Sequence, residues 1–402
     1  MKLNVAVVFG GKSTEHEVSI ISALQAIENM DKSKYEILPI YMDKTGDFYY
    51  SKDNYLVDSN NYKNMSKLKK SCERITFIKD LKHTYIREIK SSLFGNKINK
   101  VVDVVFPIVH GTNVEDGNLQ GYFHTLNIPL VGPNCLAAAV SMDKYVMKEY
   151  CKSIGIPVID AVRLDKNDLK DANTTLDDLE KSFNYPMIVK PVNLGSSIGI
   201  TKVADREELK NGLELALTFS SVVLVEKAIT NMREINCAVI GNIYDAECSL
   251  LEEPFGNDAI LSFADKYLSG SKGSNTKFGG QKLNVGSKTE NVGAKSGMAS
   301  LKRKVPAELD ERSANLIKEY SKMIFKYIGC SGVSRIDYII DKDTNQIYAN
   351  EINPIPGSLS YYLFKPMGIE YKDLIDKIIS IALDNFKMEE RLEYTFENNL
   401  LK

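Results

Sequence analysis

Three oxygen-bearing side chains near the C-terminus, accompanied by one guanidinium, have types and spacings suited to binding a divalent cation. Arg335 and Asp337 are two residues apart, and so are Glu351 and Asn353. Residues two apart on a β-strand point to the same face, so each pair is expected to share a face. A buried carboxylate is costly unless it is paired or bound to a metal. Oxygen ligands of this kind favour Mg²⁺ or Mn²⁺ over zinc.

The strands that would carry these residues can be read from composition. Segments 332–340 and 346–352 are rich in Ile, Tyr and Ala, with a polar turn at 341–345 between them. The alternative to a metal site is a structural ion pair between Arg335 and one of the acids. We favour the metal site because Asn353 adds a third oxygen and a Pro/Gly turn follows at 354–357.

Candidate ligand-binding residues also occur in the N-terminal third. Residues 3–9 are expected to form a strand whose continuous apolar run, 5–9, is typical of a strand buried on both faces, and Glu15 begins the helix that follows. A carboxylate is favoured there by the helix dipole, so Glu15 is either functional or simply a good first-turn acid. His110, Glu115 and Asp116 share a glycine-punctuated loop after another predicted strand. Ligands bind at such strand ends in open α/β sheets.

The surrounding elements indicate β-α-β alternation. Thr14 and Glu17 have the spacing of a capping box, which predicts a helix that begins at Glu15 and continues through Ile27. Strands are expected at 35–41 and 101–109. We interpret the polar, lysine-rich segment 44–100 as an elaboration with short helices.

The central segment contains a second candidate site, suited to a nucleotide. Lys190 ends an apolar strand that begins at Tyr185, and a Gly/Ser loop at 195–199 leads directly into a strand at 200–203. Such a loop can close over phosphates, with Ser196 and Ser197 offering hydroxyl groups. The alternative is an ordinary glycine-rich hairpin.

A further strand in this region, 222–225, ends in the charged pair Glu226 and Lys227. This pair could contact an adenine edge, and Glu234 could accept hydrogen bonds from ribose hydroxyls. Met142, Asp143 and Lys144 open a helix just before this region.

Bulk properties restrict the class of protein. A chain of 402 residues exceeds one ordinary core, so two or three domains are expected. The formal net charge of −2 favours neither nucleic acid nor a membrane surface as a partner. We find no apolar run long enough to span a bilayer and no signal peptide. Six scattered cysteines fit a reducing cytoplasm.

The motifs, taken in order, resemble those of the ATP-grasp superfamily and, within it, the D-alanine–D-alanine ligases. They are GGKSTEHEVS, HGTNVEDGNLQG, MDK, VKPVNLGSSIGI, VEKAI, DKY, GCSGVSRIDY and NEINPIPGS. The resemblance covers nearly the whole chain and implies an α/β (overall α+β) ATP-grasp fold. Its implied parts are a Rossmann-like N-terminal domain (1–137), a small central domain (138–232), a larger C-terminal domain (233–386) and a tail (387–402).

The resemblance also implies roles for single residues. Glu15 would hold the amino group of the first D-alanine, with His110 nearby. Arg335 and the backbone N–H of Gly357 would stabilise an oxyanion. The implied ATP contacts are Lys144, Lys190, Ser197, Glu226, Lys227, Glu234 and Lys266. The implied ligands of two Mg²⁺ or Mn²⁺ ions are Asp337, Glu351 and Asn353. Ser196 and Tyr267 would join Glu15 in tying the active-site loop to the N-terminal domain.

The chemistry implied by the family agrees with these residue types. ATP would phosphorylate the first amino acid, and the amine of the second would attack the acyl phosphate. Metals and lysines neutralise the charge of phosphoryl transfer, and fixed donors stabilise the oxyanion that follows. The resemblance further implies small amino-acid substrates, a homodimer, a cytoplasmic location and a role in peptidoglycan synthesis.

Two features depart from the family pattern. Segment 269–304 is long and basic, either a lid that attracts ATP or a flexible solvated loop. Tyr362 stands nine residues after Asn353, where the family usually has a serine that contacts the second D-alanine. Ser358 and Ser360 are nearby but out of register. Two other hypotheses are therefore a different acceptor, such as D-serine, and a nucleotide-binding regulatory protein without activity.

Overall fold

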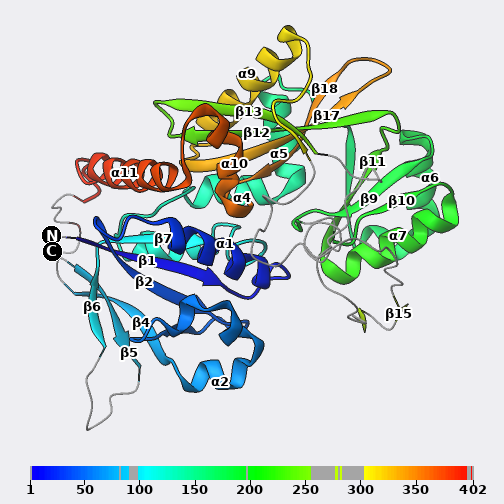
Figure 1. Cartoon of the computed structure of the whole chain (residues 1–402). Coiled ribbons are helices and arrows are strands. Elements are labelled where there is room, and N and C mark those ends of the chain that lie inside the picture. Colours follow the sequence, from blue (N-terminus) through cyan, green and yellow to red (C-terminus); the bar gives the residue numbers. More distant parts are fainter. Residues whose placement is uncertain are drawn as a thin grey trace.

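The chain is built around three large β-sheets, one mixed and two antiparallel (Figure 1). The computed structural model describes residues 2–80, 83–89, 98–195, 198–254, 277–278, 281–282, 303–395 and 400. The first sheet lies in the N-terminal part, the second in the central part and the third in the C-terminal part. This arrangement agrees with the mixed α/β architecture of several parts that was expected from the sequence.

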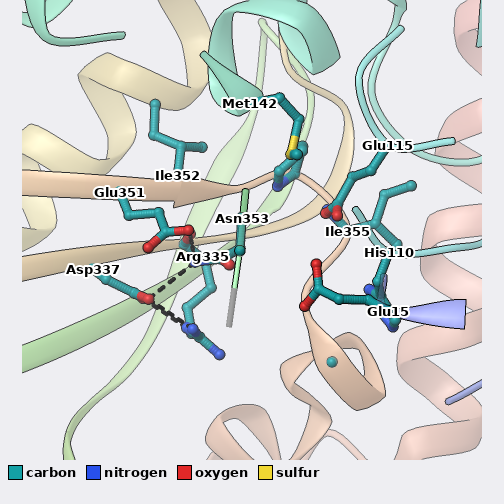
Figure 2. A pocket seen from close by; sticks show the side chains of 13 residues that line it. Glu15, His110, Glu115, Met142, Arg335, Asp337, Glu351, Ile352, Asn353 and Ile355 are labelled. Atoms are coloured by element: carbon teal, nitrogen blue, oxygen red, sulfur yellow. Dashed lines mark hydrogen bonds and ion pairs between the residues drawn. The ribbon is translucent and has the colours of Figure 1, made fainter. Parts of the chain in front are cut away.

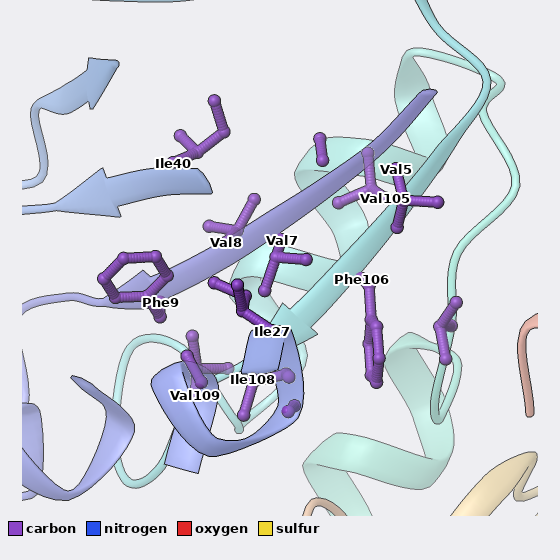
Figure 3. Close-up of a cluster of buried hydrophobic side chains, with 14 of the residues drawn as sticks. Val5, Val7, Val8, Phe9, Ile27, Ile40, Val105, Phe106, Ile108 and Val109 are labelled. Carbon is purple, nitrogen blue, oxygen red and sulfur yellow. The ribbon is translucent and has the colours of Figure 1, made fainter. Parts of the chain in front are cut away.

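The N-terminal sheet has seven strands in the order β6-β5-β4-β3-β2-β1-β7. Its strands are β1 (Leu3–Gly10), β2 (Tyr35–Met42), β3 (Phe48–Tyr50), β4 (Glu73–Asp80), β5 (His83–Glu88), β6 (Asn99–Val102) and β7 (Val104–Ile108). Strand β1 runs parallel to both β2 and β7, and Val5 to Phe9 are fully buried (Figure 3). The apolar run therefore is a strand covered on both faces, as predicted.

Segment 44–100 differs from the prediction of short helices. It contributes β3, β4, β5 and β6 to the first sheet, all in antiparallel pairs, besides the short helices η1 (Tyr55–Val57), η2 (Ser59–Lys63) and α2 (Met65–Lys70). The many lysines in this segment masked the period-2 pattern of β4, where Ile75 and Phe77 alternate with more exposed neighbours. An antiparallel extension needs one buried face only, so its strands are less apolar.

Two other boundaries also differ from the prediction. The strand expected at 101–109 is divided at Asp103 into β6 and β7, and the Asp103 carboxylate accepts the Asn4 N–H at 2.7 Å. Helix α1 (His16–Asn29) begins after Glu15, so no capping box forms at Thr14. Glu17 instead pairs with Lys44, with Nζ and Oε1 2.6 Å apart.

The central sheet has the order β10-β9-β11-β8 and is covered by two helices. Its strands are β8 (Ala161–Asp165), β9 (Met187–Pro191), β10 (Thr201–Val203) and β11 (Val222–Lys227). The helices are α6 (Ala172–Ser182), which follows η3 (Asp168–Asp171), and α7 (Arg206–Phe219). The strands predicted around the Gly/Ser loop are confirmed, because β9 precedes the loop and pairs antiparallel with β10 after it.

The C-terminal sheet has the order β16-β13-β12-β17-β18. Its strands are β12 (Met232–Gly241), β13 (Ala246–Pro254), β16 (Arg303–Lys304), β17 (Gly332–Asp341) and β18 (Ile347–Asn353). A separate pair is formed by β14 (Lys277–Phe278) and β15 (Gln281–Lys282). The two strands predicted to carry the metal ligands are confirmed as β17 and β18, and the antiparallel register places Asp337 opposite Glu351.

Helices connect and cover the three sheets. They are α3 (Asn118–Thr125), α4 (Cys135–Met142), α5 (Lys144–Ser153), α9 (Glu311–Tyr327), η5 (Gly357–Ser360), α10 (Tyr361–Phe364), η6 (Lys365–Met367) and α11 (Tyr371–Glu389). The amphipathic helix expected at 371–386 is α11, whose predicted apolar face is buried. Among the described residues, no helix is long and apolar enough to cross a membrane.

Candidate active site

A pocket between the N-terminal and C-terminal parts brings together side chains that are far apart in the sequence. It is lined by seven of the predicted residues: Glu15, His110, Arg335, Asp337, Glu351, Asn353 and Gly357. Figure 2 shows Glu15 and His110 on one side of it, and Asp337, Glu351 and Asn353 on the other. The first group comes from the N-terminal sheet and α1, and the second from β17 and β18.

Glu15 and His110 form the N-terminal wall. Glu15 is the N-cap residue of α1, is 7% exposed, and its N–H donates to Ser13 Oγ. The Gly195 backbone approaches so closely that a Cβ there would lie 2.9 Å from Glu15 Oε2. Burial lowers the pKa of His110 to about 4, and its Nε2 lies 3.0 Å from Ser22 Oγ. The wall therefore presents one carboxylate and a neutral imidazole beside the Gly/Ser loop.

Glu115 is a second acid in this pocket, and its carboxylate is buried. One oxygen accepts the Gly111 N–H at 2.8 Å and the other accepts the Ile355 N–H at 3.0 Å. Burial, reinforced by the nearby charge of Glu15, raises the pKa of Glu115 to about 8.

Arg335 and Asp337 lie side by side on the same face of β17. The Arg335 Nε and one terminal nitrogen donate to the two Asp337 oxygens at 2.6 and 2.7 Å. Asn353 Nδ2 also donates to Asp337 Oδ2, at 3.0 Å. Burial disfavours the charge on Arg335, but Asp337 outweighs it and raises the arginine pKa above its usual value. The ion pair considered as an alternative to metal binding is therefore formed in this structure.

The same acids nevertheless offer a suitable oxygen set for a divalent cation. Asp337 and Glu351 face the pocket from adjacent strands, and Asn353 supplies an amide oxygen beside them. Lys144 Nζ lies 3.5 Å from Glu351 Oε1 and donates to Leu194 O. Among the described residues, no cluster of three or more His, Cys, Asp or Glu side chains has metal-site geometry, so a third ligand would have to be Asn353.

The turn after β18 completes the pocket. Ile355 and Gly357 line it, and Ser358, Leu359 and Ser360 then adopt the left-handed conformation, with φ between 48° and 51°. Non-glycine residues rarely adopt this conformation, and such strain persists only where the surroundings impose it.

A buried triad of charged residues lies at the predicted nucleotide site. Glu226 Oε2 is 2.9 Å from Lys190 Nζ, and Glu226 Oε1 is 3.0 Å from Lys148 Nζ. Although burial opposes ionisation, the two lysines lower the pKa of Glu226. Burial lowers the pKa of Lys148 to about 8. The triad carries a net positive charge in a site suited to phosphate.

Some predicted residues are placed outside these two groups. Lys227 is exposed at the end of β11, and Glu234 lies in β12. Tyr362 does not line the pocket; its ring lies 3.9 Å below the Arg303 guanidinium, and Arg303 pairs with Glu252 at 2.7 Å. Ser196, Ser197, Lys266 and Tyr267 lie outside the described residues.

The basic segment 269–304 is described only at three short strands. Its end forms β16, which pairs with β13, so the solvated-loop interpretation is wrong for Arg303 and Lys304.

Lys148 was not identified from the sequence, and Glu115 was named only as one candidate in a glycine-punctuated loop. Lys148 follows Lys144 by four residues on α5, the spacing of side chains that share a helix face. That spacing was a usable signal for a second buried lysine. For Glu115 the loop motif was recognised, but its hydrogen bond to a residue 240 positions away leaves no trace in the local pattern.

Family models and curated relatives match this chain over almost its full length. The D-ala D-ala ligase N-terminus model matches residues 4–133, and the D-ala D-ala ligase C-terminus model matches residues 150–283 and 292–380. The D-alanine--D-alanine ligase of Thermosipho melanesiensis is 36% identical over 100% of this chain and 98% of its own. That of Thermosipho africanus is 37% identical over 99% and 98%.

Solved structures give the same result. The D-alanine-D-alanine ligase from Coxiella burnetii superposes with a TM-score of 0.76 at 27% identity, covering 97% of this chain and 96% of its own. The VanG D-Ala:D-Ser ligase from Enterococcus faecalis gives 0.73 at 29% identity, covering 95% and 100%. A D-alanine--D-alanine ligase from Bacillus anthracis complexed with ATP gives 0.63 at 25% identity, covering 97% and 99%.

Proposed function

Because this chain belongs to the D-alanine–D-alanine ligase family, we propose that the pocket between β17, β18 and the N-terminal wall is where it joins its substrates. The activity is the ATP-dependent ligation of two D-alanines, which serves peptidoglycan synthesis. The observation that carries the proposed location is the convergence of Glu15, Arg335 and the acids of β17 and β18.

On the N-terminal wall, Glu15 would bind the ammonium group of the first D-alanine. Its carboxylate lines the pocket, and neutral His110 adds no competing positive charge. The carboxylate of this D-alanine would then point toward the strands that hold Arg335. Such positioning supplies much of the rate enhancement in phosphoryl transfer.

The triad at the end of β11 would bind the nucleotide. Glu226, Lys227 and Glu234 would contact adenine and ribose, and Lys144 and Lys190 the phosphates. The buried, net positive Lys148–Glu226–Lys190 cluster supports this assignment, because phosphate would provide the missing negative charge. Ser197 in the flap and Lys266 would complete the phosphate contacts.

Asp337, Glu351 and Asn353 would hold two Mg²⁺ or Mn²⁺ ions. When bound, such ions neutralise the charge that develops on the transferred phosphoryl group. The all-oxygen donor set of these side chains suits such ions, and Lys144, whose Nζ lies 3.5 Å from Glu351 Oε1, would add a positive charge for the phosphates.

The second step would use fixed hydrogen-bond donors. Attack of the second amino group on the acyl phosphate forms a tetrahedral oxyanion, which Arg335 and the Gly357 N–H would stabilise. Ser196 and Tyr267 would close the loop over this intermediate, together with Glu15, and exclude water. Tyr362 would border the second substrate through its contact with Arg303. The parts of the chain that do this would be the domains 1–137, 138–232 and 233–386.

The test is phosphate release by the purified protein with ATP and Mg²⁺. We expect release only when D-alanine is added, with D-alanyl-D-alanine as the product. Mass analysis of products from a mixed amino-acid pool separates this from a D-serine acceptor. ATP binding without turnover on any amino acid would instead indicate a regulatory nucleotide-binding protein and would overturn the proposal.

We also propose a homodimer located in the cytoplasm. A hollow of about 520 Å³, remote from the pocket, is rimmed by exposed apolar side chains and offers a face for a second copy. The use of ATP and six cysteines without disulfides support the cytoplasmic location.

A further inference from the structure

Glu115 connects two parts of the pocket that come from opposite ends of the chain. It belongs to the loop after β7, where its Oε2 accepts the Gly111 N–H at 2.8 Å. Its Oε1 accepts the Ile355 N–H at 3.0 Å, in the turn after β18. Figure 2 shows the Glu115 carboxylate reaching toward Ile355. A single side chain thus joins the N-terminal wall to the turn that leads to Gly357.

The chemistry of this contact requires a carboxyl group of full length, because both of its oxygens can accept an N–H whether or not the group carries a proton. Two buried N–H groups point at it, and a buried N–H without an acceptor costs about 1–3 kcal/mol. A glutamine in the same place has only one oxygen, so its NH₂ group must face one of the two N–H donors. An aspartate keeps both oxygens but is shorter by one methylene and cannot span the same two donors.

The turn that Glu115 holds is strained and docked at several points. Ser358, Leu359 and Ser360 are left-handed and buried. Ser358 Oγ donates to Gln25 Oε1 at 2.8 Å, which ties the turn to α1. Ile355 lies two residues before Gly357, and Ser358 follows Gly357 directly. The contacts with Glu115 and Gln25 therefore hold the turn on both sides of the Gly357 N–H. A strained turn keeps its geometry only while such contacts hold it.

We propose that Glu115 is a positioning residue that fixes the Ile355–Gly357 turn, and with it the Gly357 N–H, for the attack step. The inference rests on the proposed function, in which Gly357 donates to the oxyanion. Glu115 itself touches neither substrate nor metal in this role. It acts by joining the turn to the N-terminal wall, so that both sides of the pocket keep one geometry.

The experiment compares Glu115→Gln and Glu115→Asp with Asp116→Asn in the full-length protein. Asp116 is a matched control, because its oxygens also accept two backbone N–H groups, those of Asn113 and Asn118, but entirely within its own loop. The readouts are kcat, the KM values for ATP and D-alanine, and hydrogen exchange of the peptide covering residues 353–360.

Loss of one oxyanion-hole donor lowers kcat by about 10²–10³-fold, so displacement of the turn is expected to lower kcat at least about tenfold in both Glu115 variants. The KM for ATP should stay within about twofold of the wild-type value, because the substitution removes no interaction that binds ATP equally in the ground state and the transition state. Exchange at 353–360 should become faster, and Asp116→Asn should match the wild type in all three readouts.

Several results would overturn the inference. One is wild-type kcat in Glu115→Gln; another is a rise in the KM for D-alanine with kcat unchanged, which indicates a substrate contact. If neither variant folds, hydrogen exchange of the wild-type protein still tests the inference. Rapid exchange of its 353–360 peptide would show that the turn is not held. A wild type without D-alanine-dependent turnover would refute the proposed function instead, while the exchange result would stand separately.

Discussion

The Asp337 carboxylate pairs with Arg335 and is also a proposed metal ligand. Arg335 engages both of its oxygens, yet a metal ligand must direct at least one oxygen to the cation. The Asn353 amide also contacts Asp337, so all three side chains are already gathered at one point. Keeping Asp337 paired avoids an isolated buried charge in the absence of metal. The ion pair and the proposed metal site are therefore compatible as two states of the same residues.

The protonation of Glu115 makes the stability of the ligand-free protein depend on pH. Its usual pKa is 4.5, and burial raises it to about 8 in the folded chain. Below pH 4.5 the Glu115 carboxyl is neutral in both the folded and the unfolded chain, so its contribution to the free energy of unfolding is fully present. Between pH 4.5 and 8 only the unfolded chain releases the proton, so stability falls with rising pH by up to about 1.4 kcal/mol per unit.

We expect Glu115→Gln to lack this loss of stability between pH 4.5 and 8. The difference in free energy of unfolding between wild type and variant should therefore shift in favour of the variant as the pH rises from 5 to 7.5. Urea denaturation at several pH values measures it. A constant offset for Glu115→Gln over this range would contradict the raised pKa.

At the scale of elements, helix α5 and strand β11 meet at the buried triad. Lys148 comes from α5, and its Nζ donates to Ile159 O as well as pairing with Glu226. Lys148→Met would leave Glu226 with Lys190 as its remaining cation from this triad. Breaking a buried pair costs about 3–5 kcal/mol, so we expect a clear fall in thermal stability. The KM for ATP should rise more than kcat falls, because Glu226 loses its fixed orientation.

Lys152→Met is the matched control for that change. Lys152 lies one turn further along α5 and pairs with Glu149 on the surface, where both side chains are more than 40% exposed. Exposed pairs of this kind contribute about 0–1 kcal/mol, so stability and ATP kinetics should stay close to those of the wild type. Equal effects of the two substitutions would show that the triad has no special role.

The elements show what the sequence could and could not predict. Strands β1, β17 and β18 were predictable because full burial or period-2 spacing is visible in a few adjacent residues. Strands β4 and β5 were missed because their exposed faces carry charged residues, as in an antiparallel extension. The capping box expected at Thr14 and Glu17 does not form, because Glu15 is the N-cap residue and Glu17 pairs with Lys44, a contact that depends on the fold.

The site shows the same division. Arg335, Asp337, Glu351 and Asn353 were identified from residue type and spacing, and the structure places all four in one pocket. Their pairing with one another in the absence of ligand depends on side-chain geometry that spacing does not specify. The bridge from Glu115 to Ile355 depends on the docking of the N-terminal and C-terminal parts, so no local pattern could reveal it.

At the scale of the whole molecule, one face carries an unusual group of exposed apolar side chains. Leu136, Ile243, Tyr244 and Leu392 are 46–68% exposed, and all four line the same hollow. It lies where α4, the β12–β13 turn and α11 meet, on the opposite side of the molecule from the central sheet (Figure 1). Glu389 is the one Asp, Glu, Lys or Arg among its lining residues, all of which are described. Depletion of charge around apolar groups is typical of an interface core.

Under the homodimer proposal, a second copy of the chain would contact this face. Exposed apolar side chains lie beside a hollow, and with Glu389 as the one charged lining residue, repulsion between two identical surfaces would be small. In a twofold dimer, the hollow of each copy would receive the protruding side chains of the other, and each contact would occur twice. Both copies would keep their active-site pockets open, because these lie elsewhere.

Leu136→Glu tests this arrangement directly. The substitution introduces two like charges into the twofold contact and removes about 1.5–3 kcal/mol of apolar burial per copy. We therefore expect the wild type to sediment as a dimer at micromolar concentration and the variant as a monomer, with D-alanine-dependent turnover retained. Leu215→Glu is the control, because Leu215 is 47% exposed on α7, away from the hollow, and this variant should remain dimeric. A dimeric Leu136→Glu protein would place the contact on another face, and a monomeric wild type would exclude it altogether.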